Sequence, residues 1–120
     1  MKQMEEFKSQ IEYKGQKYNI VFNINVIETL QKEYGTFDKW TELVQPKTKG
    51  KETDLKALIF AFTEAINEGI DIENEETGSD RKPLTLKQVG RIITEYGVSN
   101  ANQKLQEVVI KSVENDEKNA

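Results

Sequence analysis

The sequence predicts an α+β domain in which an N-terminal β-hairpin is followed by a bundle of four to five short helices. Up to Phe22, apolar and polar residues alternate, which is typical of strands with one buried face. From Asn23 onward, apolar residues recur at intervals of three and four, as on the buried face of a helix. The length of 120 residues suits one domain. We expect this domain at 1–113, with the hairpin at 7–23 and the helices at 24–113, and a flexible tail at 114–120.

The hairpin is predicted from two alternating stretches separated by Lys14-Gly15-Gln16-Lys17. Their apolar positions are Phe7, Ile11, Tyr13, Tyr18, Ile20 and Phe22. A two-residue loop at either Lys14-Gly15 or Gly15-Gln16 places odd positions opposite even ones. Either loop therefore stacks these side chains on one face of the sheet.

Two short helices are predicted after the hairpin. The first has Asn23 or Asn25 as its N-cap, with Glu28 placed to complete a capping box with Asn25. Gly35 is expected to end it, because glycine tolerates the left-handed conformation that follows many helices. The second helix is capped by Thr36 and ends before the next proline.

The clearest amphipathic pattern begins after Thr53 or Asp54, either of which can serve as the N-cap. The stripe predicted to be buried contains Leu55, Leu58, Ile59, Phe62 and Ile66. We expect Gly69 to end this helix and residues 69–83 to form an acidic loop. A loop of that length without regular structure is often mobile or functional.

Two more helices complete the predicted bundle. Thr85 and Gln88 form a capping box at the start of the first, and Gly97 ends it. Its buried face is expected to hold Leu86, Val89, Ile92, Ile93 and Tyr96. The last helix begins near Ser99, and its apolar residues are Leu105, Val108, Val109 and Val113.

The composition limits the chemistry open to this chain. Cysteine and histidine are both absent, which excludes disulfides, thiol nucleophiles, histidine bases and zinc held by either residue type. The formal net charge of −4 argues weakly against nucleic acid as the main partner. No secretory signal or membrane-spanning stretch is visible, so we expect a cytoplasmic protein without a membrane partner. We predict that it is not an enzyme, uses no cofactor or metal, and binds other proteins.

Two motifs that suggest ligand chemistry do not fit their templates. In the acidic stretch, an EF-hand loop beginning at Asp71 would need glycine and glutamate at the positions of Glu76 and Lys82. A P-loop at Gly50-Lys51 would need serine or threonine next, and Glu52 follows instead. The sequence therefore favours neither a calcium site nor a phosphate-binding loop.

A helix-turn-helix around Gly97 is the more serious alternative. The second helix of that motif buries apolar residues at positions that hold Gln103 and Gln106 here. The only basic residue on its exposed face before Lys111 is Lys104, whereas DNA-binding proteins usually present a cluster of basic residues to the DNA. We therefore predict no nucleic-acid partner.

Aromatic residues on the predicted helices mostly suit a packed core. Phe60 is different, because it lies off the apolar stripe of its helix and is expected to be partly exposed. The residues considered as candidates for partner contact are Phe37, Trp40, Phe60, Ile70 and Ile72.

The order of elements and four stretches of sequence carry a family resemblance. The stretches are YNIVFNINV at 18–26, EYGTFDKW at 33–40, EAINEGID at 64–71 and LTLKQVGR at 84–91. The chain resembles the tail assembly chaperones of long-tailed phages and prophages of Gram-positive bacteria. None of the four stretches carries catalytic chemistry.

The resemblance implies a small protein of the bacterial host cytoplasm that is absent from the finished virion. It would bind the long, largely helical tape measure protein and keep it soluble until tail tube protein polymerises around it. The family often makes a longer form by ribosomal frameshifting, and that extension recruits tail tube protein. Glu117-Lys118-Asn119 can be encoded by a slippery heptamer, so this chain is compatible with such a form.

Two other functions stay open on the sequence. The chain could be a small structural or connector protein of the phage particle, or a DNA-binding regulator of a prophage. Association with a further copy of itself is also left open. The neighbouring genes would separate these roles, since a tube gene and a very long helical reading frame favour the chaperone.

Overall fold

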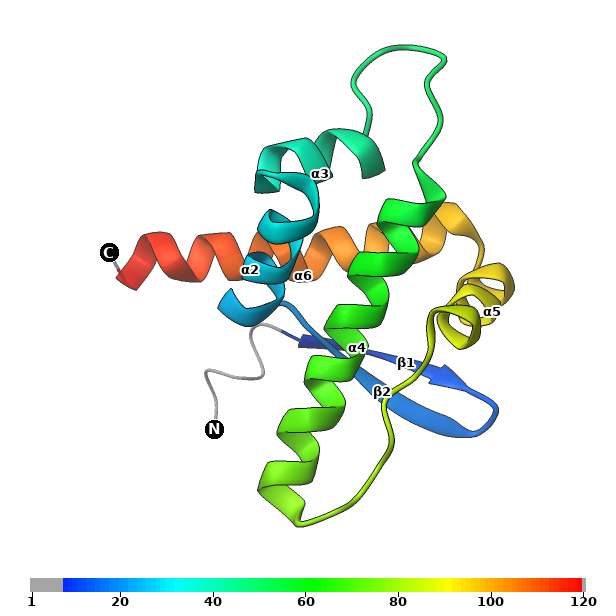
Figure 1. The fold of residues 1–120 in the computed structure, drawn as a ribbon, viewed down its shortest axis with the longest axis vertical. Coiled ribbons are helices and arrows are strands. Elements are labelled where there is room, and N and C mark those ends of the chain that lie inside the picture. The colour runs from blue at the N-terminus through cyan, green and yellow to red at the C-terminus, as the bar shows by residue number, and fades with distance from the viewer. Residues whose placement is uncertain (1–7, 120) are drawn as a thin grey trace.

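The computed structural model describes residues 8–119, which form a two-stranded antiparallel sheet followed by five helices (Figure 1). The elements are β1 (Lys8–Tyr13), β2 (Gln16–Val21), α2 (Ile24–Tyr34), α3 (Phe37–Val44), α4 (Leu55–Thr77), α5 (Leu86–Tyr96) and α6 (Val98–Asn119). The predicted α+β class, with a hairpin before a helical bundle, is confirmed. The helices are not all short, since α4 has 23 residues and α6 has 22. Phe7, the predicted start of the hairpin, lies outside the described residues.

The two strands are joined at Lys14-Gly15, which is the first of the two predicted loops. Both loop residues have positive φ, 51° and 78°, as a two-residue turn matching the strand twist requires. Ile11 pairs with Tyr18 across the ladder, and Ile11 and Ile20 are buried. The apolar face of the hairpin is therefore the one that the alternation predicts.

The start of α2 decides between the two predicted caps. Asn23 is the N-cap, and its Oδ1 accepts a hydrogen bond from the Val26 amide at 3.3 Å. Asn25 lies within the helix, and its side chain donates to Glu68 at 2.9 Å instead of forming a capping box with Glu28. Glu68 also accepts from Asn23 Nδ2 at 2.7 Å. One carboxylate of α4 thus fixes the beginning of α2.

The predicted starts of α3, α4 and α5 are confirmed by their caps. The side chain of Thr36 accepts from the amide three residues ahead at 3.0 Å, and Asp54 does the same at 2.9 Å. Thr85 and Gln88 form the predicted capping box, with bonds of 3.2 and 2.8 Å in the two directions. The glycines that follow α2 and α5 have φ of 89° and 92°.

Gly69 does not end α4, so the predicted end of this helix is wrong. The helix continues to its C-cap at Gly78, which adopts the left-handed conformation with φ of 71°. The buried stripe continues as well, because Ile70 follows Ile66 by four residues and both are buried. Gly69 serves a tertiary contact, since a Cβ there would lie 2.5 Å from the carbonyl oxygen of Asn19 in β2.

The predicted loop at 69–83 is wrong for residues 69–77, which belong to α4, and the remaining connection to α5 is held against α4 by two asparagines. Asn74 exchanges two hydrogen bonds with the backbone of Arg81, at 2.9 and 3.1 Å. Asn67 does the same with the backbone of Leu84, at 3.0 and 2.8 Å. A spacing of seven places both amides on one face of α4. The connecting segment is therefore tied along this helix.

The last helix begins at Val98, one residue before the predicted start, and runs to Asn119. Its predicted end at Val113 is too early, because the helix includes residues 114–119 that were expected as a tail. Leu105, Val108 and Val109 are buried as predicted.

Two leucines expected in the core are exposed: Leu55 at 52% and Leu86 at 54%. Each occupies the first position of its helix. A helical side chain leans toward the N-terminus, so at this position it extends past the packed face.

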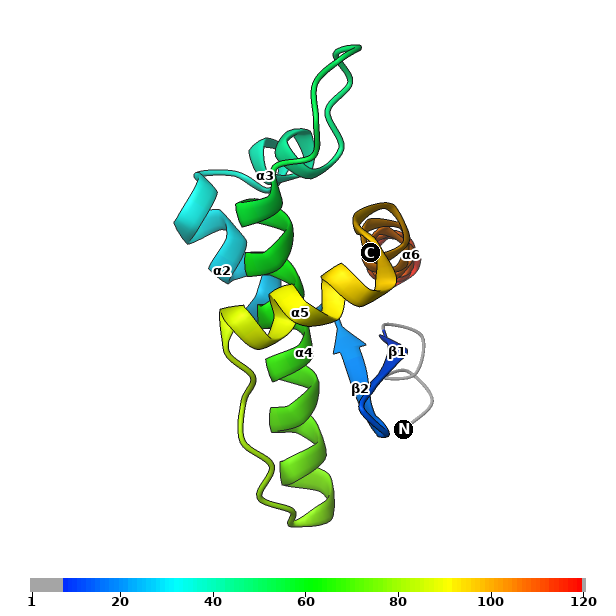
Figure 2. The ribbon, with the colours of Figure 1, turned by 90° about the vertical axis from the view of Figure 1, so that its right-hand side faces the viewer.

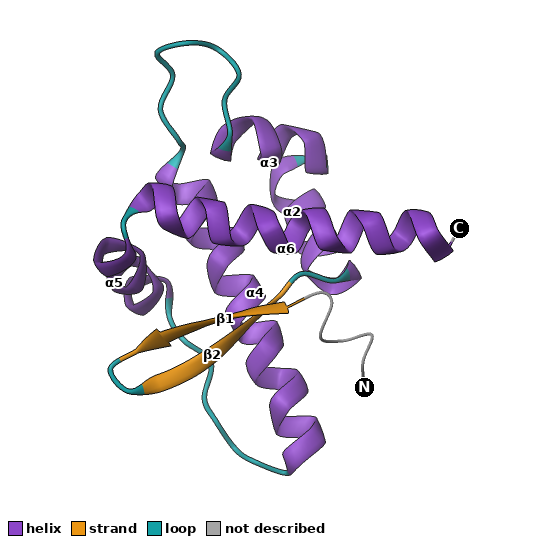
Figure 3. Ribbon diagram, turned by 180° about the vertical axis from the view of Figure 1, so that it is seen from behind, coloured by secondary structure: helices purple, strands orange, loops and turns teal. Residues whose placement is uncertain are grey.

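The helix α4 occupies the centre of the fold and contacts β2, α2, α3 and α5. The hairpin and α6 lie on one side of it and α2 on the other (Figures 2 and 3). One continuous core takes side chains from each of these elements. Its largest fully buried members are Trp40, Phe22, Phe62, Ile20 and Leu30.

Candidate protein-binding site

A groove with a volume of about 670 Å³ lies between α4 and α5. It is lined by Lys56, Ile59, Phe60, Leu86, Lys87, Gly90, Arg91 and Thr94. Its apolar surface comes from Ile59, Phe60 and Leu86. Gly90 deepens the groove, because a Cβ at this position would have only Ile59 Cδ1 nearby, at 3.9 Å. We call this surface the α4–α5 groove.

Phe60 is half-buried, as its position off the stripe predicts. Its ring meets the Tyr34 ring edge-on, with centroids 5.9 Å apart. Burial, followed by the nearby charges of Glu33 and Asp54, raises the pKa of Tyr34 above its usual value. The Tyr34 hydroxyl therefore stays neutral over the physiological range, and its ring packs against Phe60 beside the groove.

The other candidate residues lie outside the α4–α5 groove. Trp40 is fully buried, and its Nε1 donates to the carbonyl of Ala57 at 3.1 Å. Phe37 is half-buried, with its ring centroid 5.5 Å from that of Trp40. These aromatic rings join α3 to the core, and Trp40 offers no surface to a partner.

The two isoleucines of the expected acidic loop belong to α4. Ile70 is only 3% exposed and is part of the core. Ile72 is half-buried and does not line the groove. The structure thus leaves Phe60 as the one candidate residue in this groove.

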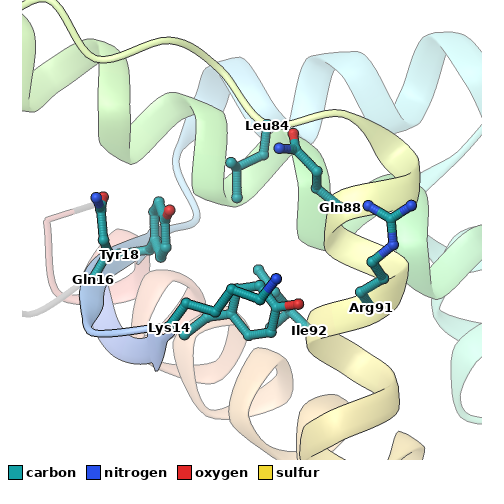
Figure 4. A pocket seen from close by; sticks show the side chains of 8 residues that line it. Lys14, Gln16, Tyr18, Leu84, Gln88, Arg91 and Ile92 are labelled. Carbon is teal, nitrogen blue, oxygen red and sulfur yellow. The ribbon is translucent and has the colours of Figure 1, made fainter.

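A second, smaller pocket of about 260 Å³ lies on the other side of α5, between this helix and the hairpin (Figure 4). It is lined by Tyr13, Lys14, Gln16, Tyr18, Leu84, Gln88, Arg91 and Ile92. Leu84, Ile92 and the two tyrosine rings supply apolar walls. Lys14, Gln88 and Arg91 supply hydrogen-bond donors. We call this the hairpin pocket.

Tertiary contacts fix both walls of the hairpin pocket. The Tyr96 hydroxyl bonds to the backbone of Glu12 in β1, accepting from the amide at 3.0 Å and donating to the carbonyl at 3.3 Å. The Arg81 guanidinium stacks over the Tyr18 ring, 4.7 Å from its centroid, and pairs with Glu73 at 2.9 Å. The hairpin is therefore held to the end of α5 and to the segment that precedes it.

Arg91 lines both concavities, so the groove and the pocket form one surface across α5. Neither is lined by an aspartate or glutamate. The sequence patterns do not predict the residues that build this surface, namely Lys14, Lys56, Leu86, Lys87, Gln88, Gly90 and Arg91. One pattern could have indicated a basic surface here, because Lys87 and Arg91 are four residues apart and thus neighbours on one face of the predicted helix.

The link between α5 and α6 bears on the helix-turn-helix alternative. Only Gly97 separates Tyr96, the last residue of α5, from Val98, the first residue of α6. The turn of a helix-turn-helix has three to four residues. This pair of helices therefore does not have the connection of that motif.

The chain matches no protein-family model, no curated protein and no solved structure. Among residues 9–112, no three histidine, cysteine, aspartate or glutamate side chains are grouped so that they could hold a metal ion. No helix in the described part of the chain is both long and apolar enough to cross a membrane.

Proposed function

We propose that this protein is a tail assembly chaperone of a long-tailed phage or prophage, and that it binds the tape measure protein through the α4–α5 groove. Two observations support the proposal. The sequence resembles this family over 18–26, 33–40, 64–71 and 84–91. The groove presents an aromatic and two aliphatic side chains in a concave surface between helices, which is the shape that accepts an amphipathic helix.

The groove is the observation on which the proposal chiefly rests. A long helical client exposes apolar stripes until its assembly partners cover them, and such stripes promote aggregation. Ile59, Phe60 and Leu86 can cover part of a stripe by removing it from water. No bond is made or broken in this role, so it needs no catalytic group. Delivery to tail tube protein, through a longer frameshifted form, belongs to the same proposal.

The test is co-expression with the adjacent tape measure protein in the bacterial host. The wild-type chain should keep this client in the soluble fraction, and Leu86→Asp should lower the recovered amount. Ile24→Asp is the matched control, because Ile24 is 74% exposed and, like Leu86, occupies the first position of a helix. It lies outside the groove, so it should leave client recovery unchanged.

Two outcomes would contradict the proposal. One is a client that is equally soluble without this protein, and the other is an equal loss of soluble client from Leu86→Asp and Ile24→Asp. Both variants should keep the thermal unfolding transition of the parent within a few degrees, because both replace exposed side chains at helix starts, where aspartate is tolerated.

A further inference from the structure

The surface across α5 is positively charged, although the chain as a whole is acidic. The formal net charge is −4, yet Lys56, Lys87 and Arg91 line the groove, and Lys14 and Arg91 line the pocket. Among residues 9–112, whose side chains the structure describes, the ion pairs are Lys32–Glu28 and Arg81–Glu73. The four cations of this surface thus have no ion-pair partner in the described part of the chain.

Two of the three donors of the hairpin pocket, Gln88 and Lys14, have positioning contacts of their own. Gln88 uses its Oε1 to accept from the Thr85 amide at 2.8 Å, so its Nε2 group remains to donate. Lys14 Nζ lies 5.3 Å from the centroid of the Tyr13 ring. Figure 4 shows Lys14, Gln88 and Arg91 around the same opening. Together with the apolar walls, this arrangement suits a side chain with methylene groups and a terminal carboxylate.

We propose that the occupant of this surface is an acidic amphipathic helix of a protein partner. Its apolar side chains fill the α4–α5 groove, and its carboxylates pair with Lys56 and Lys87, with one carboxylate entering the hairpin pocket between Lys14 and Arg91. Arg91 takes part on both sides of α5. This inference rests on the proposed function and specifies the chemistry of the client segment that the chaperone selects.

Charge complementarity favours this occupant over others. A basic helix would bring like charges against four cations, and a second copy of α5 would do the same. A nucleic-acid strand could satisfy the cations, but it would leave Ile59 and Leu86 without an apolar partner. An acidic helix satisfies both the charges and the apolar floor of the groove.

Three synthetic helices provide the test. They are capped peptides of about 20 residues, long enough for helix formation, with the same leucine stripe. The flanking positions carry glutamate in the first, glutamine in the second and lysine in the third. Binding to the full chain is followed by fluorescence anisotropy. The glutamate peptide should bind about tenfold more tightly than the glutamine peptide, and added salt should reduce this difference.

Four single substitutions locate the contact. Arg91→Gln should weaken binding of the glutamate peptide most, by about five- to tenfold, because it serves both concavities. Lys14→Gln tests the hairpin pocket alone, and Lys87→Gln tests the groove alone; each should weaken binding about two- to threefold. Lys32→Gln, on α2, makes the same charge change away from this surface and should have no effect. None of the four should alter affinity for the glutamine peptide by more than about twofold.

The inference is overturned if no peptide binds, if the three peptides bind equally, or if Arg91→Gln behaves like Lys32→Gln. A single-stranded oligonucleotide that displaces the glutamate peptide at equal concentration would show a phosphate site instead. The chaperone role is judged separately by co-expression. Client solubility that depends on Leu86, together with indifference to peptide charge, would leave that role in place and remove only the acidic preference.

Discussion

Gly69 of α4 faces the backbone of Asn19 in β2 so closely that a Cβ on the glycine would lie 2.5 Å from the Asn19 carbonyl oxygen. This contact sets the distance between the central helix and the hairpin. It also explains why a residue with poor helix propensity stands inside a 23-residue helix. The position of the hairpin relative to α4 in turn decides where the hairpin pocket forms.

Gly69→Ala should therefore destabilise the protein, although alanine favours helices. The added methyl group meets backbone rather than a flexible side chain, so α4 or β2 must shift. Overpacking of this kind costs about 1–3 kcal/mol in the free energy of unfolding. Chemical denaturation followed by circular dichroism measures it. A variant as stable as the parent would show that the two segments can separate without loss.

Gly90→Ala is the matched substitution in α5, and it should have the opposite effect. A Cβ at this position would lie in ordinary contact, 3.9 Å from Ile59 Cδ1. Replacing a helical glycine by alanine should stabilise the fold by about 0.5–1 kcal/mol. The same methyl group narrows the α4–α5 groove, so client recovery should fall while the melting temperature rises. A rise in both client recovery and melting temperature would contradict the proposal that the groove binds the client.

Phe62→Ala tests the core beneath this surface. Phe62 is 1% exposed and belongs to the stripe that α4 buries. Removing its ring should cost about 3–5 kcal/mol in unfolding free energy. Phe60→Ala, two residues earlier and half-buried, should cost clearly less. Equal costs would mean that Phe60 is as much a core residue as Phe62 and is not free to contact a partner.

Glu64→Gln should stabilise the protein at neutral pH. Burial, and then the charge of Glu68 one turn away, raises the pKa of the Glu64 carboxyl above its ordinary 4.5. A carboxyl whose pKa is higher in the folded state opposes folding increasingly as the pH rises above the unfolded-state pKa, and in full above the folded-state pKa. The gain over the parent should therefore be present at neutral pH and should disappear as the pH falls below 4.5. Melting curves across this range measure it, with exposed Glu76→Gln as control.

Most boundaries of the fold could be predicted because they depend on neighbouring residues. The alternation around Lys14-Gly15 identifies the hairpin, and Thr36, Asp54 and the Thr85–Gln88 pair identify helix starts. Caps and turns are satisfied within a few residues of chain, so their signals are local.

Most residues of the proposed binding surface could not be predicted, for the opposite reason. Phe60 was found because its exposure follows from helix periodicity alone. Lys14 and Arg91 are 77 positions apart, and only the packing of the hairpin against α5 brings them to one pocket. Leu86 was expected in the core, but at the first position of α5 it extends into the groove.

The sequence by itself determined the hairpin, its inner face and, to within one or two residues, the start of each helix, since these follow from periodicity and capping. It also determined that histidine and cysteine chemistry are absent. Only the tertiary structure explains the role of Gly69. The local sequence predicts that this glycine ends the helix, but it lies inside α4 because β2 approaches it closely. Asn67 and Asn74 then hold the following segment along the helix. Contacts between distant segments carry no local signature, so only the packed fold reveals them.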